Sequence, residues 1–174
     1  MKLSKRSIYI ILVIILTIAV DQISKVLVRT HIEARTEINP GERISLIGNA
    51  FLMMNVENTG AFLGMGSDLN PTLRIILLLI LPIVVLGFVL RYIFKDKSLD
   101  NASLFAFASI VGGGFANVYD RIVYGSVTDF LFIDLGGIFR TGIFNMADLS
   151  VTTGMIILVI VSFKKKKNSE ALKN

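Results

Sequence analysis

The residues best suited to chemistry in this chain are aspartates that lie in or beside long apolar segments, namely Asp21, Asp120, Asp129 and Asp148. A charge at the centre of a bilayer costs at least about 2.5–3.5 kcal/mol on insertion scales, so acids in such positions are usually functional or paired. Two carboxyl groups held close together can share one proton. The ionised group then acts as a general base on water, while the protonated group activates a scissile carbonyl.

The composition removes most other hydrolytic chemistries. The chain has no cysteine, which excludes a thiol nucleophile, a disulfide framework and a thiolate metal site. His31 is the single histidine, so a Ser-His triad or a multi-histidine metal site has little to work with. If the protein is a hydrolase, its chemistry must therefore come from carboxylates, lysines or hydroxyls, and we expect no metal or cofactor. Basic and aromatic residues do not interleave as they do in nucleic-acid-binding proteins, and we expect no nucleic acid partner.

Long apolar runs must position these acids. Of the 174 residues 53% are hydrophobic and 18% are charged, and the mean hydropathy is +0.71. Four apolar stretches are long enough to cross a bilayer, and they predict spans at about 8–28, 73–90, 102–118 and 143–163. We expect one membrane domain over 1–174, with outer segments at 29–72 and 119–142 and a disordered tail at 164–174. The first span is too long for a usual signal peptide and lacks a small-residue cleavage site, so it is interpreted as a retained helix.

The basic residues predict the orientation of the chain. Three precede the first span, three lie between the second and third spans, and five follow the fourth. The positive-inside rule then places both termini in the cytoplasm. The outer half of the first span contains Asp21 and Lys25, the outer end of the third contains Asn117, Asp120 and Arg121, the next outer segment contains Asp129, and the outer part of the fourth span contains Asn145 and Asp148. Four carboxylates thus converge at a similar depth near the outer interface.

Several of these residues also have a purely structural interpretation. Asp21 and Lys25 are four residues apart on a helix, so they could neutralise each other inside a bundle or take a direct role. Asp120 and Arg121 could cap the outer end of the third span and pin the following loop, which is the interpretation we favour. On its pattern alone, Asp129 is equally consistent with a solvated loop acid.

Asp148 is harder to explain structurally, because it lies in an apolar span with no basic residue one turn away. The consecutive glycines 112–114 are expected to be helix-packing residues. His31 is expected at the membrane interface rather than as a ligand. In the outer segments, Glu42–Met54 predicts one or two short strands and Asn39-Pro40-Gly41 a turn, while Val127–Leu135 could rest in the interface.

Five short motifs in this chain resemble those of a known family. They are Asp21-Gln22-Ile23-Ser24-Lys25, Asn58-Thr59-Gly60-Ala61, Gly113 through Asn117 to Asp120-Arg121, Val127-Thr128-Asp129-Phe130 and Phe144-Asn145-Met146-Ala147-Asp148. They are similar to the D-Q-x-[ST]-K, N-x-G-A, G-x-x-x-N-x-x-D-R, V-x-D-F and F-N-x-A-D boxes of the lipoprotein signal peptidases (signal peptidase II), which are intramembrane aspartic peptidases. Each box alone is a weak signal, but five in the right order on a four-span layout form a strong one.

The resemblance implies a fold and a site. The fold would be an all-α integral membrane protein with four transmembrane helices, a small extracytoplasmic β-sheet cradle and a short, mobile interfacial helix over the active site. This agrees with the interpretation of 42–54 and 127–135. The catalytic pair would be Asp129 and Asp148, a choice that depth alone does not make between Asp129 and Asp120. The implied binding and supporting residues are Asp21, Lys25, Asn58, Gly60, Asn117, Asp120, Arg121 and Asn145, with Arg121 contacting the substrate backbone.

The resemblance also implies a substrate and a location. The enzyme would cleave a prolipoprotein on the N-terminal side of a diacylglyceryl-modified cysteine, working as a monomer among the lipids of the bacterial cytoplasmic (inner) membrane. A lipid anchor holds the scissile bond near the headgroups, where the acids lie. Two positions depart from the family pattern. Phe62 follows Ala61 directly, where the family often has a second alanine, and Leu149 replaces the usual serine.

Three other functions compete with that of a signal peptidase. An ion- or proton-coupled transporter also uses intramembrane acids, but it often shows inverted repeats or broken helices at the bilayer midplane. Here no repeat is found, and the acids gather at one face. An assembly factor held by the glycine-rich span gives no reason for Asp148. A presenilin-type protease would be expected to carry a G-x-G-D motif, which this chain lacks.

Overall fold

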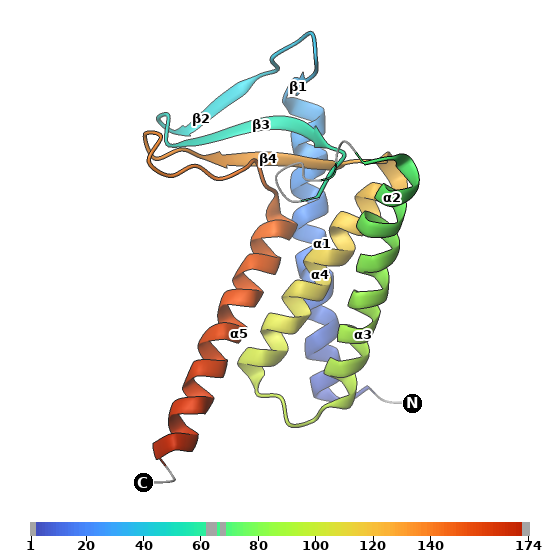
Figure 1. Ribbon diagram of the computed structural model, residues 1–174, viewed down its shortest axis with the longest axis vertical. Helices are drawn as coiled ribbons and strands as arrows, with labels where there is room; N and C mark the ends of the chain where they lie inside the picture. The colour runs from blue at the N-terminus through green and yellow to red at the C-terminus, as the bar shows by residue number, and fades with distance from the viewer. Residues whose placement is uncertain (1–2, 62–65, 67–68, 172–174) are drawn as a thin grey trace.

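Four long helices carry a small β-sheet at one end, and both termini lie at the opposite end (Figure 1). This computed structural model describes residues 3–61, 66 and 69–171. The helical elements are α1 (Lys5–His31), α2 (Pro71–Ile75), η2 (Ile76–Ile80), α3 (Leu81–Lys95), α4 (Asn101–Tyr124) and α5 (Met146–Ala171). The strands are β1 (Ala34–Arg35), β2 (Arg43–Ile47), β3 (Phe51–Asn58) and β4 (Val127–Ile133). The predicted fold, four spans with a small sheet, is confirmed.

Both ends of α5 differ from those of the fourth span expected at 143–163. The helix begins at Met146 rather than at residue 143, because Asn145 caps it: the Asp148 amide donates to Asn145 Oδ1 at 2.9 Å. The helix also continues through Ala171, so the expectation that the tail after residue 163 is disordered was wrong. A helix that is already formed adds residues at low cost, and lysine is a good helix former.

The central helix of the bundle is α4, and three consecutive glycines let the other three spans approach it. A Cβ atom at Gly112 would lie 2.7 Å from Thr17 of α1, and one at Gly113 would lie 2.5 Å from the Ala147 carbonyl oxygen of α5. A Cβ atom at Gly114 would lie 2.6 Å from Leu86 of α3. Successive helical positions point about 100° apart. The predicted packing role of these glycines is therefore confirmed, with one neighbouring helix for each glycine.

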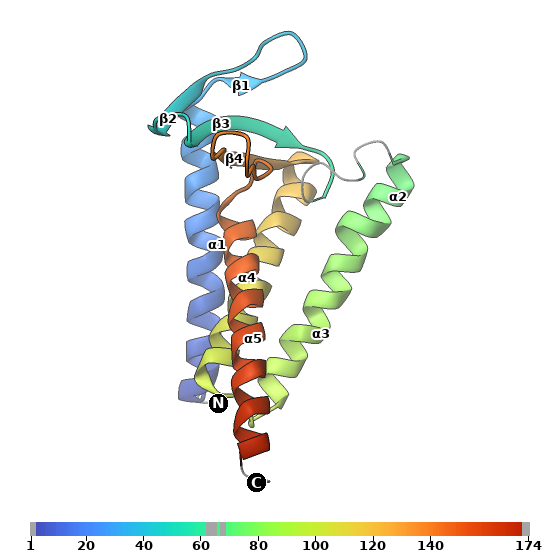
Figure 2. The ribbon, with the colours of Figure 1, turned by 60° about the vertical axis from the view of Figure 1, so that its left-hand side comes forward.

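The second span is one continuous helix from Pro71 to Lys95 that widens in the middle. Over Ile76–Ile80 it forms a π-helical turn, in which the Leu81 amide donates to the Ile76 carbonyl. Pro82 explains this, because its ring clashes with the carbonyl one turn before it and it has no N–H to donate. In Figure 2 this span leans away from α4 toward the sheet end.

The sheet is built around β3. Along it, β2 pairs antiparallel at Arg43↔Met54 and β1 pairs parallel at Ala34↔Asn55. Strand β4 pairs antiparallel, with Val56 opposite Asp129 and Asn58 opposite Val127. The two strands expected in 42–54 are confirmed as β2 and β3, and the turn before them has Gly41 at φ 69° with its amide bonded to Asn39 Oδ1.

The segment 127–135, interpreted from sequence as a piece that could rest in the interface, is largely strand β4. Its run of Val, Thr and Phe residues favours a strand, and Phe144 extends the sheet by bridging to Leu131. The sheet rests on the C-terminal end of α1, where Val28 and Ile32 pack against Phe130 and Leu131. Among the described residues, the outer segments contain no separate interfacial helix.

Candidate active site

Two carboxyl groups from different elements meet at the junction of the sheet and the bundle. Asp129 is the third residue of β4, and Asp148 lies in the first turn of α5. Asn145 joins them: its side-chain amide donates to Asp129 Oδ1 at 2.6 Å, and its backbone amide lies 3.2 Å from Asp148 Oδ2. A single fully buried residue therefore holds one oxygen of each acid.

Asp129 is buried, with 3% of its surface exposed. Burial, together with a smaller effect of the nearby Asp148 charge, raises the pKa of its carboxyl to about 7. Amide donors from Asn58, at 2.8 Å from Oδ2, and from Asn145 oppose that rise, because they stabilise the ionised form. This carboxyl can hold a proton near neutral pH, so the alternative of a solvated loop acid does not describe it.

Asp148 is half-buried and also belongs to the start of α5. Asp148 forms a reciprocal capping box with Asn145. The side chain of each residue accepts a hydrogen bond from the backbone amide of the other. Its second oxygen accepts from the Asn117 side-chain amide at 2.9 Å. Helix capping thus fixes the carboxyl at the N-terminal end of α5, where the helix dipole favours negative charge.

Below the two acids lies a buried charge cluster centred on Lys25. Its ammonium group contacts Asp21 Oδ2 at 2.7 Å, Asp120 Oδ2 at 2.7 Å and the Asn117 side-chain oxygen at 2.8 Å. Asp21, Lys25 and Asp120 are all fully buried. Two interpretations were open for Asp21 and Lys25, and the observed contact is the one in which they neutralise each other inside the bundle. Lys25 also contacts Asn117, the residue that donates to Asp148.

Asp21 also anchors α5 to α1. Its second oxygen accepts from the Ala147 backbone amide at 2.8 Å, directly beside Asp148 in the sequence. Gln22 donates to Asp120 Oδ1 at 3.0 Å, so consecutive residues of α1 reach α5 and α4. Gln22 was part of the first motif but was not predicted as a site residue.

The favoured interpretation, in which Asp120 and Arg121 cap the end of the third span and pin the following loop, was wrong. Helix α4 continues to Tyr124, and its C-cap is Gly125 with φ 76°. Asp120 is buried against Lys25 and lies 3.4 Å from Arg29. Arg121 does not pin the following loop: its guanidinium donates to the Gly60 carbonyl at 2.9 Å and to the Asn117 carbonyl at 3.3 Å.

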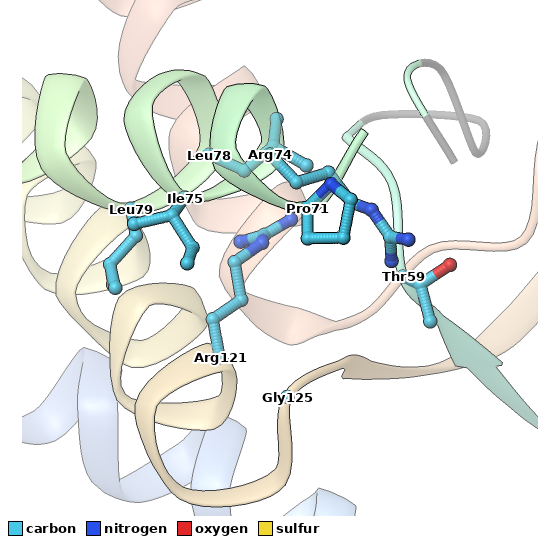
Figure 3. A pocket seen from close by; sticks show the side chains of 8 residues that line it. All are labelled: Thr59, Pro71, Arg74, Ile75, Leu78, Leu79, Arg121 and Gly125. Atoms are coloured by element: carbon cyan, nitrogen blue, oxygen red, sulfur yellow. The ribbon is translucent and has the colours of Figure 1, made fainter. Parts of the chain in front are cut away.

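Arg121 lines a cleft of about 240 Å³ between α4 and the N-terminal end of the second span. The cleft is bounded by Thr59, Pro71 and Gly125 near the sheet and by Ile75, Leu78 and Leu79 along the helix (Figure 3). It combines a guanidinium end with an apolar wall, so it suits an elongated amphiphilic ligand.

The structure therefore brings the ten predicted site residues into one region, where Asp129 and Asp148 form an upper layer over Asp21, Lys25 and Asp120. Asn58, Gly60, Asn117, Arg121 and Asn145 lie at or between the two layers. His31 is exposed and bonds only to Thr30 and Leu27. Leu149 is 44% exposed, and Phe62 lies outside the described residues. No group of three His, Cys, Asp or Glu side chains able to hold a metal occurs in the described part of the chain.

Sequence reasoning missed Arg29 as part of this region. Its Nε donates to Thr128 Oγ1 at 2.7 Å, and its guanidinium stacks 3.9 Å from the centre of the Tyr124 ring. Thr128 in turn donates to Glu57 of β3 at 2.7 Å. The signal available in the sequence was the spacing, because Arg29 follows Lys25 by four residues and so shares its helix face.

Comparisons with known proteins point to one family. A sequence model of the family described as "Signal peptidase (SPase) II" matches residues 13–164. The lipoprotein signal peptidase of Borrelia duttonii is 36% identical over 156 residues, covering 87% of this chain and 88% of its own length. That of Borrelia hermsii is 32% identical, covering 92% and 93%, and that of Treponema pallidum is 30% identical, covering 87% and 81%.

Solved structures show the same arrangement of elements. A bacterial membrane enzyme determined by the in meso method superposes with a TM-score of 0.78 at 25% identity, covering 92% of this chain and 90% of its own. A second structure of that description gives a TM-score of 0.75, covering 90% and 93%. The likeness extends over nearly the whole of each chain, so it includes both the bundle and the sheet.

Proposed function

The chain belongs to the signal peptidase II family, and from this premise we propose that it cleaves diacylglyceryl-modified prolipoproteins on the N-terminal side of the lipidated cysteine. We propose further that Asp129 and Asp148 carry the reaction. The observation that supports this pair is Asn145, whose two N–H groups hold one oxygen of each carboxyl. A pair fixed in this way, with one member of raised pKa, can keep a single proton between two acids.

The proposed reaction needs only this pair and one water. The ionised carboxyl removes a proton from the water as its oxygen adds to the scissile carbonyl carbon. The protonated carboxyl gives its proton to the carbonyl oxygen, which forms a neutral tetrahedral intermediate. The carboxyl that took the proton from water then gives it to the cysteine nitrogen, the C–N bond breaks, and the other, now ionised, carboxyl removes a proton from a hydroxyl of the intermediate, so the signal peptide leaves with a new carboxyl terminus. Both acids end the cycle with one proton between them, so no metal or cofactor enters the balance.

The neighbouring residues would position the substrate. Gly60, through its carbonyl, and Arg121 lie side by side at the cleft. In this proposal Arg121 uses its remaining N–H capacity to bind the substrate backbone, and Asn58 holds Asp129 against the site. The lipid of the substrate would keep the scissile bond at the depth of the two acids. The reaction between bond and acids then becomes effectively unimolecular.

The protein has four helices that can cross a membrane, consistent with a multi-pass membrane enzyme. We propose that both termini are cytoplasmic and that the sheet and the acid pair face the outer side of the cytoplasmic membrane. The basic residues at the ends of the helices opposite the sheet support this orientation. All ten site residues come from one chain, which supports a monomer as the working unit.

The test is cleavage of a diacylglyceryl-modified lipobox peptide by purified protein in detergent, followed by mass spectrometry of the products. Wild type should cut before the lipidated cysteine. Asp129→Asn and Asp148→Asn should each lower kcat by about 10²–10⁴-fold, the range expected for loss of a general acid or base.

Asp134→Asn is the matched control, because Asp134 follows β4 but pairs with the exposed Arg140 outside the site. It should keep near wild-type activity. If Asp129→Asn or Asp148→Asn stays folded and remains fully active, the assignment of the pair is wrong. If folded wild type cleaves no lipidated peptide, the proposed substrate is wrong.

A further inference from the structure

A second arginine enters the cleft beside Arg121. Arg74 comes from the first turn of the second span, and Figure 3 shows its guanidinium reaching toward Thr59 while Arg121 rises from α4. The two side chains form the polar end of the cleft. None of the described residues that line the cleft is acidic.

The two arginines differ in what they already bind. Arg121 donates to the Gly60 and Asn117 carbonyls and so belongs to the network around the acid pair. Arg74 forms no ion pair and no side-chain hydrogen bond with any described residue, and its Nε is buried from solvent. A buried guanidinium N–H without an acceptor costs free energy, so this position favours a ligand that brings acceptor oxygens.

The wall next to Arg74 is hydrocarbon. Ile75, Leu78 and Leu79 continue the cleft down the second span, and the last two belong to the widened η2 turn. Such π-helical turns are rare and occur frequently at functional sites. The cleft therefore fits a ligand with acceptor oxygens at its outer end and acyl chains along η2.

We propose that Arg74 binds the ester carbonyl oxygens of the diacylglyceryl group on the substrate cysteine, while the acyl chains lie along η2. This inference rests on the proposed function and assigns a lipid-binding residue to the same cleft. The lipidated cysteine carries two ester carbonyls and no phosphate, and it enters beside Arg121, where the peptide would lie. Arg74 is in the first turn of a membrane-spanning helix, which is the depth of lipid ester groups.

The test compares two peptides of one sequence, one with ester-linked acyl chains and one with ether-linked alkyl chains that lack the carbonyl oxygens. Cleavage of each by wild type and Arg74→Gln is measured over a range of substrate concentrations. Arg91→Gln is the control, because Arg91 lies in the same span at its other end and is exposed.

Arg74→Gln should raise KM for the ester substrate by about tenfold, the effect of losing a hydrogen bond to a charged donor. It should leave KM for the ether substrate unchanged, which also shows that the variant is folded. Wild type should bind the ether substrate as weakly as Arg74→Gln binds the ester substrate.

Equal losses on both substrates would overturn the proposal and point to a phospholipid phosphate or the peptide as the group that Arg74 binds. No loss on either substrate would overturn it as well. These outcomes differ from failure of the proposed function, in which wild type would cleave neither peptide.

Discussion

Lys25 Nζ lies 2.8 Å from the side-chain carbonyl oxygen of Asn117. Because an ammonium group can only donate, this contact fixes the amide with its oxygen toward Lys25 and its NH₂ toward Asp148, which it meets at 2.9 Å. Asn145 donates to the same oxygen at 3.2 Å. A buried charge in α1 therefore determines which end of an amide in α4 faces a carboxyl in α5.

Replacing Lys25 should destabilise the protein through the acids that it neutralises. Lys25→Met leaves Asp21 and Asp120 buried without their ammonium partner, and breaking a buried ion pair in this way costs about 3–5 kcal/mol. The thermal unfolding midpoint in detergent should fall clearly. The triple variant Asp21→Asn, Lys25→Met, Asp120→Asn should regain part of that loss, because it buries no unpaired charge. A triple variant no more stable than Lys25→Met would show that packing, rather than charge, explains the effect.

Gly113→Ala should impair activity without touching either acid. The added Cβ would lie 2.5 Å from the Ala147 carbonyl oxygen, and the helix backbone there cannot yield as a side chain can. The first turn of α5 would move, and with it Asp148. Gly87→Ala is the control, since a Cβ at that helical glycine meets nothing within 4 Å. We expect a drop in kcat/KM for the first variant and none for the second, measured with the ester-linked peptide.

The pH dependence of activity should report Asp129. Its pKa of about 7 means that both acids become ionised as the pH rises above neutrality, so kcat/KM should fall on the alkaline side with an apparent pKa near 7. Asn58 stabilises the ionised form, so Asn58→Ala should raise the pKa and move that alkaline limb to higher pH. A limb that moves to lower pH, or stays fixed, would contradict this role for Asn58.

The Asp129 carboxyl should also make the stability of the folded protein depend on pH. The folded protein holds the Asp129 proton more tightly than the unfolded chain, whose carboxyl has its ordinary value of 3.8. The contribution of this group to stability is therefore complete below about pH 4 and declines as the pH rises to about 7. Thermal unfolding followed across this window should show that decline in wild type. Asp129→Asn should show a smaller one, because its amide does not titrate.

Thr128→Val should loosen the sheet from the bundle. The hydroxyl accepts from Arg29 Nε and donates to Glu57, so its loss leaves a buried guanidinium N–H without a partner, at a cost of about 1–3 kcal/mol. We expect a lower unfolding midpoint and faster hydrogen exchange in β4. Thr30→Val is the control, because Thr30 is exposed on the same side of α1 as His31 and bonds only locally. Equal effects from both variants would exclude this link between sheet and bundle.

The sequence by itself determined the four spans and the family. Apolar runs of sufficient length are a local property, so the spans could be placed before any contact was known, although capping by Asn145 moved the start of α5. The packing glycines 112–114 were also recognisable, because small residues in an apolar helix have few other uses. The acids could be assigned a depth in the same way, since depth follows from position along a span.

Partners, in contrast, depend on contacts between distant segments. Residue types alone gave Asp120 and Arg121 a shared role at a helix end, yet their side chains point in different directions, to Lys25 and to Gly60. Strand β4 was not recognised because its hydrogen-bonding partner, β3, is far away in the sequence and its side chains are buried on both faces. Only the tertiary structure could decide that Asn145 holds both acids, because that contact requires β4 and the start of α5 to be packed together.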